Sequence, residues 1–167
     1  MEVIDDFVPS NDFRILQANL MRHKGFPWYY NYDCLVEKGD GKSQFVHTFY
    51  NNTDTRNGTN SDFYFLLDSC QDKLGVKELL RIKANLRPAT IFGRGSRYHT
   101  DVPELGPHKT AILYMNTCNG YTKFKKGGRV RSVANRIAIF DSDLDHAGVA
   151  CSDEKVRVVI NFNYISK

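Results

Sequence analysis

Residues 79–87 read LLRIKANLR, and from Leu80 onward apolar side chains alternate with basic or amide side chains. A period of two places alternate side chains on opposite faces of a β-strand. The stretch therefore predicts a half-buried strand with one apolar face against a core. It also divides the chain, because the spacing of apolar residues is mainly helical before it and strand-like after it.

The part after this strand is a series of short apolar segments separated by turns. Asn119-Gly120 and Gly127-Gly128 are turn signals, since Asn and Gly tolerate the left-handed backbone conformations of tight turns. The second of them predicts a hairpin between residues 121–124 and 130–133. The expected strands are 90–92, 109–116, 121–124, 130–133, 137–140 and 156–164, the last being the longest, with further turns at 93–96 and 135–136.

The part before residue 79 begins with a helix. Ser10 follows Pro9 and is expected as the N-cap, and Phe13, Leu16 and Leu20 recur at i, i+3 and i+7. Further along we expect an extended aromatic stretch from residue 28, a polar loop over 51–61 and a second helix over 62–74.

Helices followed by consecutive short strands indicate a mainly β protein of the α+β class, with an antiparallel sandwich or barrel. The length of 167 residues fits one domain with its own core. We expect helical support over about residues 1–75 and a β core over about 76–167.

Composition and charge disfavour several classes of protein. No run approaches the roughly 18 apolar residues of a membrane-spanning helix, and the acidic start lacks the pattern of a signal peptide, so we expect a cytoplasmic protein. The net charge of +4 is modest, and the basic runs 123–126 and 129–131 lie beside glycines of the expected hairpin. Nucleic acid is therefore a disfavoured partner. The cysteines at 34, 70, 118 and 151 lack C-x-x-C spacing and are expected to be free thiols.

His99-Thr100-Asp101 is followed by a distant His146 and then by Arg157. Residues two apart on an extended segment point the same way, so His99 and Asp101 can approach one metal together. Two imidazoles and one carboxylate form the facial triad of non-haem iron(II) oxygenases, which leaves metal positions open. A basic residue further on supplies the charge that a dicarboxylic co-substrate needs. This order predicts an iron(II)- and 2-oxoglutarate-dependent oxygenase.

Each of these residues also has an alternative interpretation, in which it has an ordinary structural role and binds neither a metal nor a co-substrate. An H-x-D sequence alone is usually a surface pair, and an arginine on a strand is usually solvated. For Arg157 the binding role is favoured, because apolar Val158 and Ile160 mark its strand as internal. His108 is favoured as a loop residue over a spare ligand, since it lacks a carboxylate at ligand spacing. The acidic run 141–145 lacks the Gly and Glu that a calcium loop requires.

Several ordered motifs resemble those of the iron(II)/2-oxoglutarate oxygenases, particularly the small prolyl-hydroxylase-like branch and related single-domain proteins of phages and marine bacteria. The match runs over about residues 79–164, roughly half of the chain, and the segment after residue 6 is similar to the family's support helix. The motifs are Y-H-T-D (98–101), I-L-Y-M-N (112–116), N-G-Y-T-K-F (119–124), S-V-A-N-R-I-A-I-F (132–140), H-A-G (146–148) and R-V-V-I-N-F (157–162).

The resemblance implies a double-stranded β-helix, a distorted jelly roll with N-terminal supporting helices. It implies that His99, Asp101 and His146 are the metal ligands and the catalytic residues. The implied cofactors are iron(II), 2-oxoglutarate and dioxygen, with ascorbate as an optional reductant. The family's G-G-x-T turn is N-G-Y-T at 119–122 in this chain, which can alter the rim of the cavity.

The resemblance also implies a site for the co-substrate. Arg157 would bind the distal carboxylate of 2-oxoglutarate, with Tyr114 and Asn161 at positions from which polar groups assist. The spacing from His146 to Arg157 is eleven residues. This departs from the family's pattern and affects the direction in which the arginine side chain points. The nucleic-acid demethylases of the superfamily carry a second arginine where this chain has Asn163.

The expected reaction is hydroxylation of an unactivated C–H bond in a prolyl or other amino-acid or peptide side chain, with a small metabolite ranked next. A cupin-like metal-binding isomerase, which shares the jelly roll and histidine ligands, is the alternative. A non-catalytic binding barrel is a third class. The substrate is expected to be selected by the loops 51–61 and 94–98, because specificity tends to lie on loops over a rigid scaffold.

Overall fold

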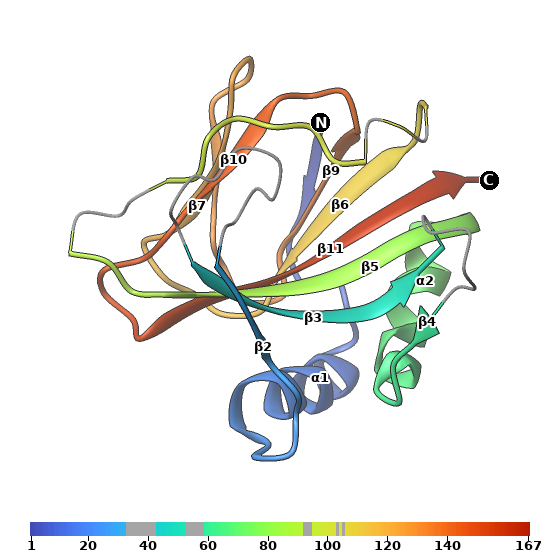
Figure 1. The fold of residues 1–167 in the computed structure, drawn as a ribbon. Coiled ribbons are helices and arrows are strands. Elements are labelled where there is room, and N and C mark those ends of the chain that lie inside the picture. The colour runs from blue at the N-terminus through green and yellow to red at the C-terminus, as the bar shows by residue number, and fades with distance from the viewer. Residues whose placement is uncertain (33–42, 53–58, 92–94, 103, 105) are drawn as a thin grey trace.

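The computed structural model describes residues 1–32, 43–52, 59–91, 95–102, 104 and 106–167. Within these residues, two antiparallel β-sheets face each other and two α-helices lie on the outer side of the larger sheet (Figure 1). This is the mainly β arrangement with N-terminal supporting helices that the sequence predicts.

The larger sheet has the strand order β1-β9-β6-β11-β5-β3-β2, with β4 paired to β3. At its centre, β11 pairs with β5 on one side and with β6 on the other. Its strands are β1 (Glu2–Ile4), β2 (Tyr29–Asn31), β3 (Gln44–Asn51), β4 (Thr59–Asn60), β5 (Val76–Pro88), β6 (Lys109–Tyr114), β9 (Ile137–Asp141) and β11 (Val156–Ser166).

The smaller sheet has the order β10-β7-β8, with bounds β7 (Tyr121–Phe124), β8 (Arg129–Arg131) and β10 (His146–Val149). The hairpin expected across Gly127-Gly128 is confirmed as the β7–β8 pair, and both glycines have positive φ. Two isolated bridges, Gly95 with Val149 and His99 with His146, place the segment 95–99 beside β10. That segment therefore extends the smaller sheet over the larger one.

Two hydrophobic cores lie on opposite faces of the larger sheet. The outer core joins α1 (Ser10–Arg22) and α2 (Asp68–Leu74) to the alternate apolar positions of β5, such as Ile82 and Ala84. A second core between the sheets contains Phe124 and Val130 of the smaller sheet with Ile112, Tyr114, Ala138, Phe140 and Val159 of the larger one. The polar face of β5 thus looks toward the space between the sheets, because its apolar face is used by the helices.

Some sequence-based expectations need correction. Ser10 is the first helical residue and not the cap, since Pro9 occupies the N-cap position without a side-chain hydrogen bond. The last strand has 11 residues and is shorter than β5, which has 13. Thr90 and Ile91 are not in a strand, and residue 92 lies outside the described residues.

The residues on the N-terminal side of residue 75 form both helices and strands. Residues before it provide α1, the 3-10 turn η1 (Tyr64–Leu67) and α2, as expected for helical support. They also provide β1, which pairs with β9, and β3, which pairs with β5. The edge strands β1 and β2 have three residues each, and strands this short give little periodic signal in the sequence. Among the described residues, no helix is long and apolar enough to cross a membrane.

Candidate metal centre

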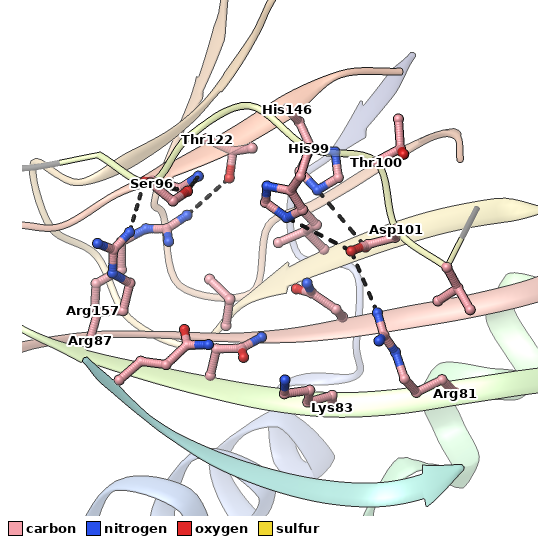
Figure 2. Close-up of a pocket in the computed structure, with 17 residues that line it drawn as sticks. Arg81, Lys83, Arg87, Ser96, His99, Thr100, Asp101, Thr122, His146 and Arg157 are labelled. Carbon is pink, nitrogen blue, oxygen red and sulfur yellow. Dashed lines mark hydrogen bonds and ion pairs between the residues drawn. The ribbon is translucent and has the colours of Figure 1, made fainter. Parts of the chain in front are cut away.

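The two predicted histidine ligands are brought together by backbone pairing. The His99 N–H donates to the His146 carbonyl at 3.0 Å, and the His146 N–H donates to the His99 carbonyl at 2.9 Å. The two imidazole centroids lie 4.6 Å apart as a result. His146 is the first residue of β10 and is buried, whereas His99 is half-buried on the facing segment (Figure 2).

Asp101 completes the group from a bend two residues after His99. One carboxylate oxygen lies 3.9 Å from His99 Nε2, and the other lies 3.8 Å from His146 Nε2. The carboxylate is held from the far side, because Arg81 Nη2 donates to Oδ1 at 3.5 Å and Asn163 Nδ2 donates to Oδ2 at 3.4 Å. One ligand atom from each of the three residues lies within 4.8 Å of the others.

The histidine side chains are oriented as metal ligands would be. His99 Nδ1 lies 3.2 Å from the Arg97 carbonyl oxygen, and His146 Nδ1 lies 3.0 Å from the Leu144 carbonyl oxygen. A carbonyl only accepts, so each Nδ1 carries the proton and each Nε2 presents a lone pair toward Asp101. This arrangement, with the second ring nitrogen donating to the backbone, is the usual support of a metal-bound imidazole. The residues therefore fit a divalent metal with nitrogen and oxygen ligands.

Burial and charge set the protonation of the group. Burial by itself would raise the pKa of Asp101, but the neighbouring His146, Arg81 and His99 lower it overall. Burial lowers the pKa of His146, which outweighs the opposing effect of Asp101. An ionised Asp101 carboxylate and a neutral His146 imidazole are the forms that bind a metal.

Arg157 lies in the same cavity as the candidate ligands, at the other end (Figure 2). It is 3% exposed, and its Nη2 donates to Thr122 Oγ1 at 3.0 Å. Its Nε is buried and has no hydrogen-bond partner among the described residues. Burial lowers the pKa of Arg157 from its usual value, and the nearby Arg87 lowers it further. An arginine held in this way has remaining donors for an anion.

Gly120 makes room for this arginine. A Cβ atom at Gly120 would lie 2.6 Å from Arg157 Cδ and 2.9 Å from the Val149 carbonyl oxygen. The N-G-Y-T turn therefore keeps the glycine that allows the arginine stem to pass.

Tyr114 and Asn161 occupy different positions relative to the cavity. The Tyr114 hydroxyl donates to Thr122 Oγ1 at 2.9 Å, and Tyr114 is fully buried and does not line the cavity. Burial raises the pKa of Tyr114, against the opposing effect of Arg157. Asn161 does line the cavity, and its Oδ1 is buried without a partner among the described residues.

The cavity has a volume of about 250 Å³ and lies between β5, β11 and the segment 95–102. Sequence reasoning alone did not identify Thr122 or Ser96 as part of it. Arg81 and Arg87, from the alternating stretch 79–87, also line the cavity. The alternation over residues 79–87 indicates that both arginines lie on the same, polar face of this strand. Lys109 lies outside the cavity and pairs with Asp141 at the exposed surface, at 2.6 Å.

The remaining histidines lie outside the metal group. His47 is buried among aromatic rings and contacts the Pro27 carbonyl oxygen and Ser61 Oγ, as expected for a packing residue. His108 lies in a loop and contacts the Gly106 carbonyl oxygen, as predicted. Most of the loop 51–61 and residue 94 of the loop 94–98, both expected to select the substrate, lie outside the described residues.

Comparisons with known proteins bear on the fold. No protein-family model matches the sequence, and no curated protein matches it. Solved structures do match: a Pseudomonas putida prolyl-4-hydroxylase is 16% identical with a TM-score of 0.62, over 99% of this chain and 92% of that one. A prolyl hydroxylase from Trichoplax adhaerens, in complex with a peptide fragment of the hypoxia inducible factor oxygen degradation domain, is 16% identical with a TM-score of 0.64, over 98% and 82%.

A third similar structure is the viral collagen prolyl hydroxylase of Paramecium Bursaria Chlorella virus-1, as its complex with 2OG. It is 13% identical with a TM-score of 0.62, and the match covers 99% of this chain and 96% of that one. Nearly whole chains are superimposed in each case, so the likeness extends to the sheets, the supporting helices and their order. The chain therefore has the jelly-roll fold of the prolyl hydroxylases and other 2OG-Fe(II) oxygenases, as its sequence motifs indicate.

Proposed function

We propose that this protein is an iron(II)- and 2-oxoglutarate-dependent dioxygenase that hydroxylates an unactivated C–H bond. One observation carries the proposal: the His99, Asp101 and His146 group and the buried Arg157 line a single cavity. A metal group alone would suit many jelly-roll proteins. A buried arginine facing the same cavity supports a carboxylate-bearing co-substrate, for which a cupin-like isomerase has no need.

In this proposal His99, Asp101 and His146 hold iron(II) from one side. The backbone carbonyls of Arg97 and Leu144 fix the imidazoles, while Arg81 and Asn163 fix the carboxylate. The bound metal and co-substrate would supply oxidative chemistry with dioxygen that no protein side chain provides. Ascorbate would serve only to keep the metal reduced, and a reducing cytoplasm would serve the same purpose.

Arg157 would bind the distal carboxylate of 2-oxoglutarate through its guanidinium fork. Thr122 fixes the guanidinium at 3.0 Å, and the Tyr114 hydroxyl in turn donates to Thr122 at 2.9 Å. We therefore assign Tyr114 a supporting role through Thr122. Asn161, on the same face of β11 as Arg157, offers a further polar group in the cavity.

We propose an amino-acid or peptide side chain, prolyl among them, as the class of substrate. Support comes from the motif resemblance and from the prolyl hydroxylases that share the fold, one of which was solved with a peptide fragment.

Anaerobic titration tests the proposal directly. Adding 2-oxoglutarate to the iron(II)-loaded protein should produce a metal-to-ligand charge-transfer band, which requires both ligands on one metal. On admission of air with peptide and amino-acid panels, succinate and a product heavier by 16 Da should form. A protein that binds iron(II) but gives no band would favour a cupin-like or non-catalytic barrel.

A further inference from the structure

The hairpin formed by β7 and β8 concentrates positive charge. Residues 121–131, here called the basic hairpin, contain no acidic residue and five basic ones, which are Lys123, Lys125, Lys126, Arg129 and Arg131. The whole chain carries a formal net charge of +4, so the chain outside the hairpin carries −1. A solvated surface usually mixes both signs of charge. The basic hairpin therefore differs from the rest of the molecule.

The charges of the hairpin lie on the outer face of the smaller sheet. Its other face is buried toward the space between the sheets, through Thr122, Phe124 and Val130. Successive side chains of a strand point to opposite faces, so Lys123, Arg129 and Arg131 point outward. Arg129 and Arg131 are exposed, and Lys123 stands directly opposite Arg129 in the pairing of the two strands.

Acidic side chains of the protein neutralise little of this face. Asp145 pairs with Lys125 at 2.9 Å, and both side chains are partly exposed. None of the other four basic residues of the hairpin takes part in an ion pair with a described residue. Like charges directly opposite on a sheet, such as Lys123 and Arg129, destabilise it. An acidic partner would relieve this repulsion.

The basic hairpin reaches the candidate metal centre. Lys123 Nζ lies 4.7 Å from the centroid of the Tyr98 ring, and Tyr98 immediately precedes the ligand His99. In the next register position Phe124 pairs with the ligand His146. A chain that binds the outer face of the hairpin is therefore held beside the segment that carries two of the three ligands.

The free edge of β8 favours a polypeptide as the partner. The Ser132 N–H donates to the Gly120 carbonyl at 2.9 Å, and hydrogen-bonded pairs alternate along an antiparallel ladder. Arg131 and Arg129 thus direct their own N–H and C=O groups away from β7. In the described part of the chain, β8 is the last strand of the smaller sheet on this side. An extended peptide can pair with such an edge through its main chain, which a nucleic acid lacks.

From this geometry, and resting on the proposed function, we propose that the substrate is an acidic polypeptide whose carboxylates bind the basic hairpin. Neighbouring strands lie about 4.8 Å apart, so β8 is about 10 Å from β10, which carries His146. An extended chain covers this distance in about three or four residues. The acidic residues are therefore expected within a few residues of the side chain that is hydroxylated.

The test uses the full chain, loaded anaerobically with iron(II) and saturated with 2-oxoglutarate. Fluorescence anisotropy compares three labelled probes: a short peptide with a proline flanked by glutamates, the same peptide with glutamines in place of the glutamates, and a single-stranded oligothymidylate of equal charge. The glutamate peptide should bind at least about tenfold more tightly than the glutamine peptide, and this preference should decrease as salt rises. After air is admitted, the glutamate peptide should also give more of the product heavier by 16 Da.

Arg129→Gln combined with Arg131→Gln removes two charges from the exposed face. It should weaken binding of the glutamate peptide by roughly 2- to 30-fold, the range expected for two exposed ion pairs, and leave binding of the glutamine peptide unchanged. Lys126→Gln, at the exposed tip, is a milder second variant. The matched control is Arg22→Gln combined with Lys24→Gln, which removes the same charge at the exposed end of α1, on the outer side of the larger sheet (Figure 1). The control should bind as the parent does.

The outcomes separate the two proposals. A parent protein that shows no charge-transfer band with 2-oxoglutarate overturns the proposed function, and the anisotropy result does not depend on that band. Equal binding of the glutamate and glutamine peptides, or an equal loss in the control variant, overturns the basic hairpin as a docking surface. Tighter binding of the oligothymidylate than of the glutamate peptide overturns the choice of a polypeptide. A glutamate peptide that binds more tightly but is hydroxylated no better overturns the role of the hairpin in substrate binding.

Discussion

Replacing Arg157 tests the co-substrate site at its most buried group. Arg157→Ala removes the charge and the fork, and Arg157→Lys keeps the charge but removes the paired, planar donors. Both variants should retain iron(II), because Arg157 makes no contact with His99, Asp101 or His146 in the described structure. Affinity for 2-oxoglutarate should fall in the order parent, Lys variant, Ala variant.

The magnitude follows from the burial of the group. Arg157 is 3% exposed, so a carboxylate bound to it is largely shielded from water. Loss of one charged partner in such a place costs on the order of 2–4 kcal/mol, or roughly 30- to 1000-fold in affinity. Arg87 stands opposite and can take over part of the binding, which places the expected loss for Arg157→Ala toward the lower end. Tyr114→Phe removes one hydroxyl that supports Thr122 and should cost about tenfold or less.

The assay is anaerobic titration of each iron-loaded variant with 2-oxoglutarate, followed by the charge-transfer band. Iron content and the midpoint of thermal unfolding are measured in parallel, so that a misfolded variant is recognised. If Arg157→Ala binds 2-oxoglutarate as tightly as the parent, the reasoning is refuted. Arg87, whose Nη1 now donates to the Gly148 carbonyl at 2.8 Å, would then be the first residue to substitute.

Three further predictions concern the metal and the fold. His99→Ala, Asp101→Ala and His146→Ala should each lose iron(II) on anaerobic gel filtration while their far-UV spectra stay unchanged; iron retained at the parental level by Asp101→Ala would contradict the assignment. Asn135→Ala should destabilise the protein by about 2–4 kcal/mol in urea unfolding, because Asn135 has φ of 64° and its side chain both accepts from the Val8 N–H and donates to the Val8 carbonyl at 2.8 Å; Asn135→Gly, which tolerates this φ, should lose less. Burial lowers the pKa of His47 in the folded state. Below about pH 6.5 the unfolded chain therefore binds a proton that the folded chain does not bind, and the free energy of unfolding decreases as the pH is lowered. His47→Gln should reduce the stability difference between pH 7.5 and 5.5 in the metal-free protein, with His23→Gln, at the exposed end of α1, as the control substitution.

Local patterns were enough to predict the class of the β core and most of its strands, although β10 was not among them. The alternation over 79–87 and the turn at Gly127-Gly128 reflect constraints within one strand or one hairpin, and both are confirmed. The edge strand β1 was not predicted, because three residues carry no period and its pairing with β9 joins segments that lie far apart in the sequence. The cap at Ser10 was wrong for a related reason, since a residue type preferred at a cap does not fix where the backbone turns.

The sequence by itself determined which residues could form the site, because the order of His99, Asp101, His146 and Arg157 can be recognised without a structure. Only the tertiary structure decided how they meet. The His99–His146 bridge sets the two imidazoles 4.6 Å apart, and the register of β5 against β11 places Arg87 opposite Arg157. It also decided that the polar face of 79–87 faces a cavity and not water, because the helices cover the other face of the sheet. A period of two tells which side chains share a face, but what that face meets depends on segments far away in the chain.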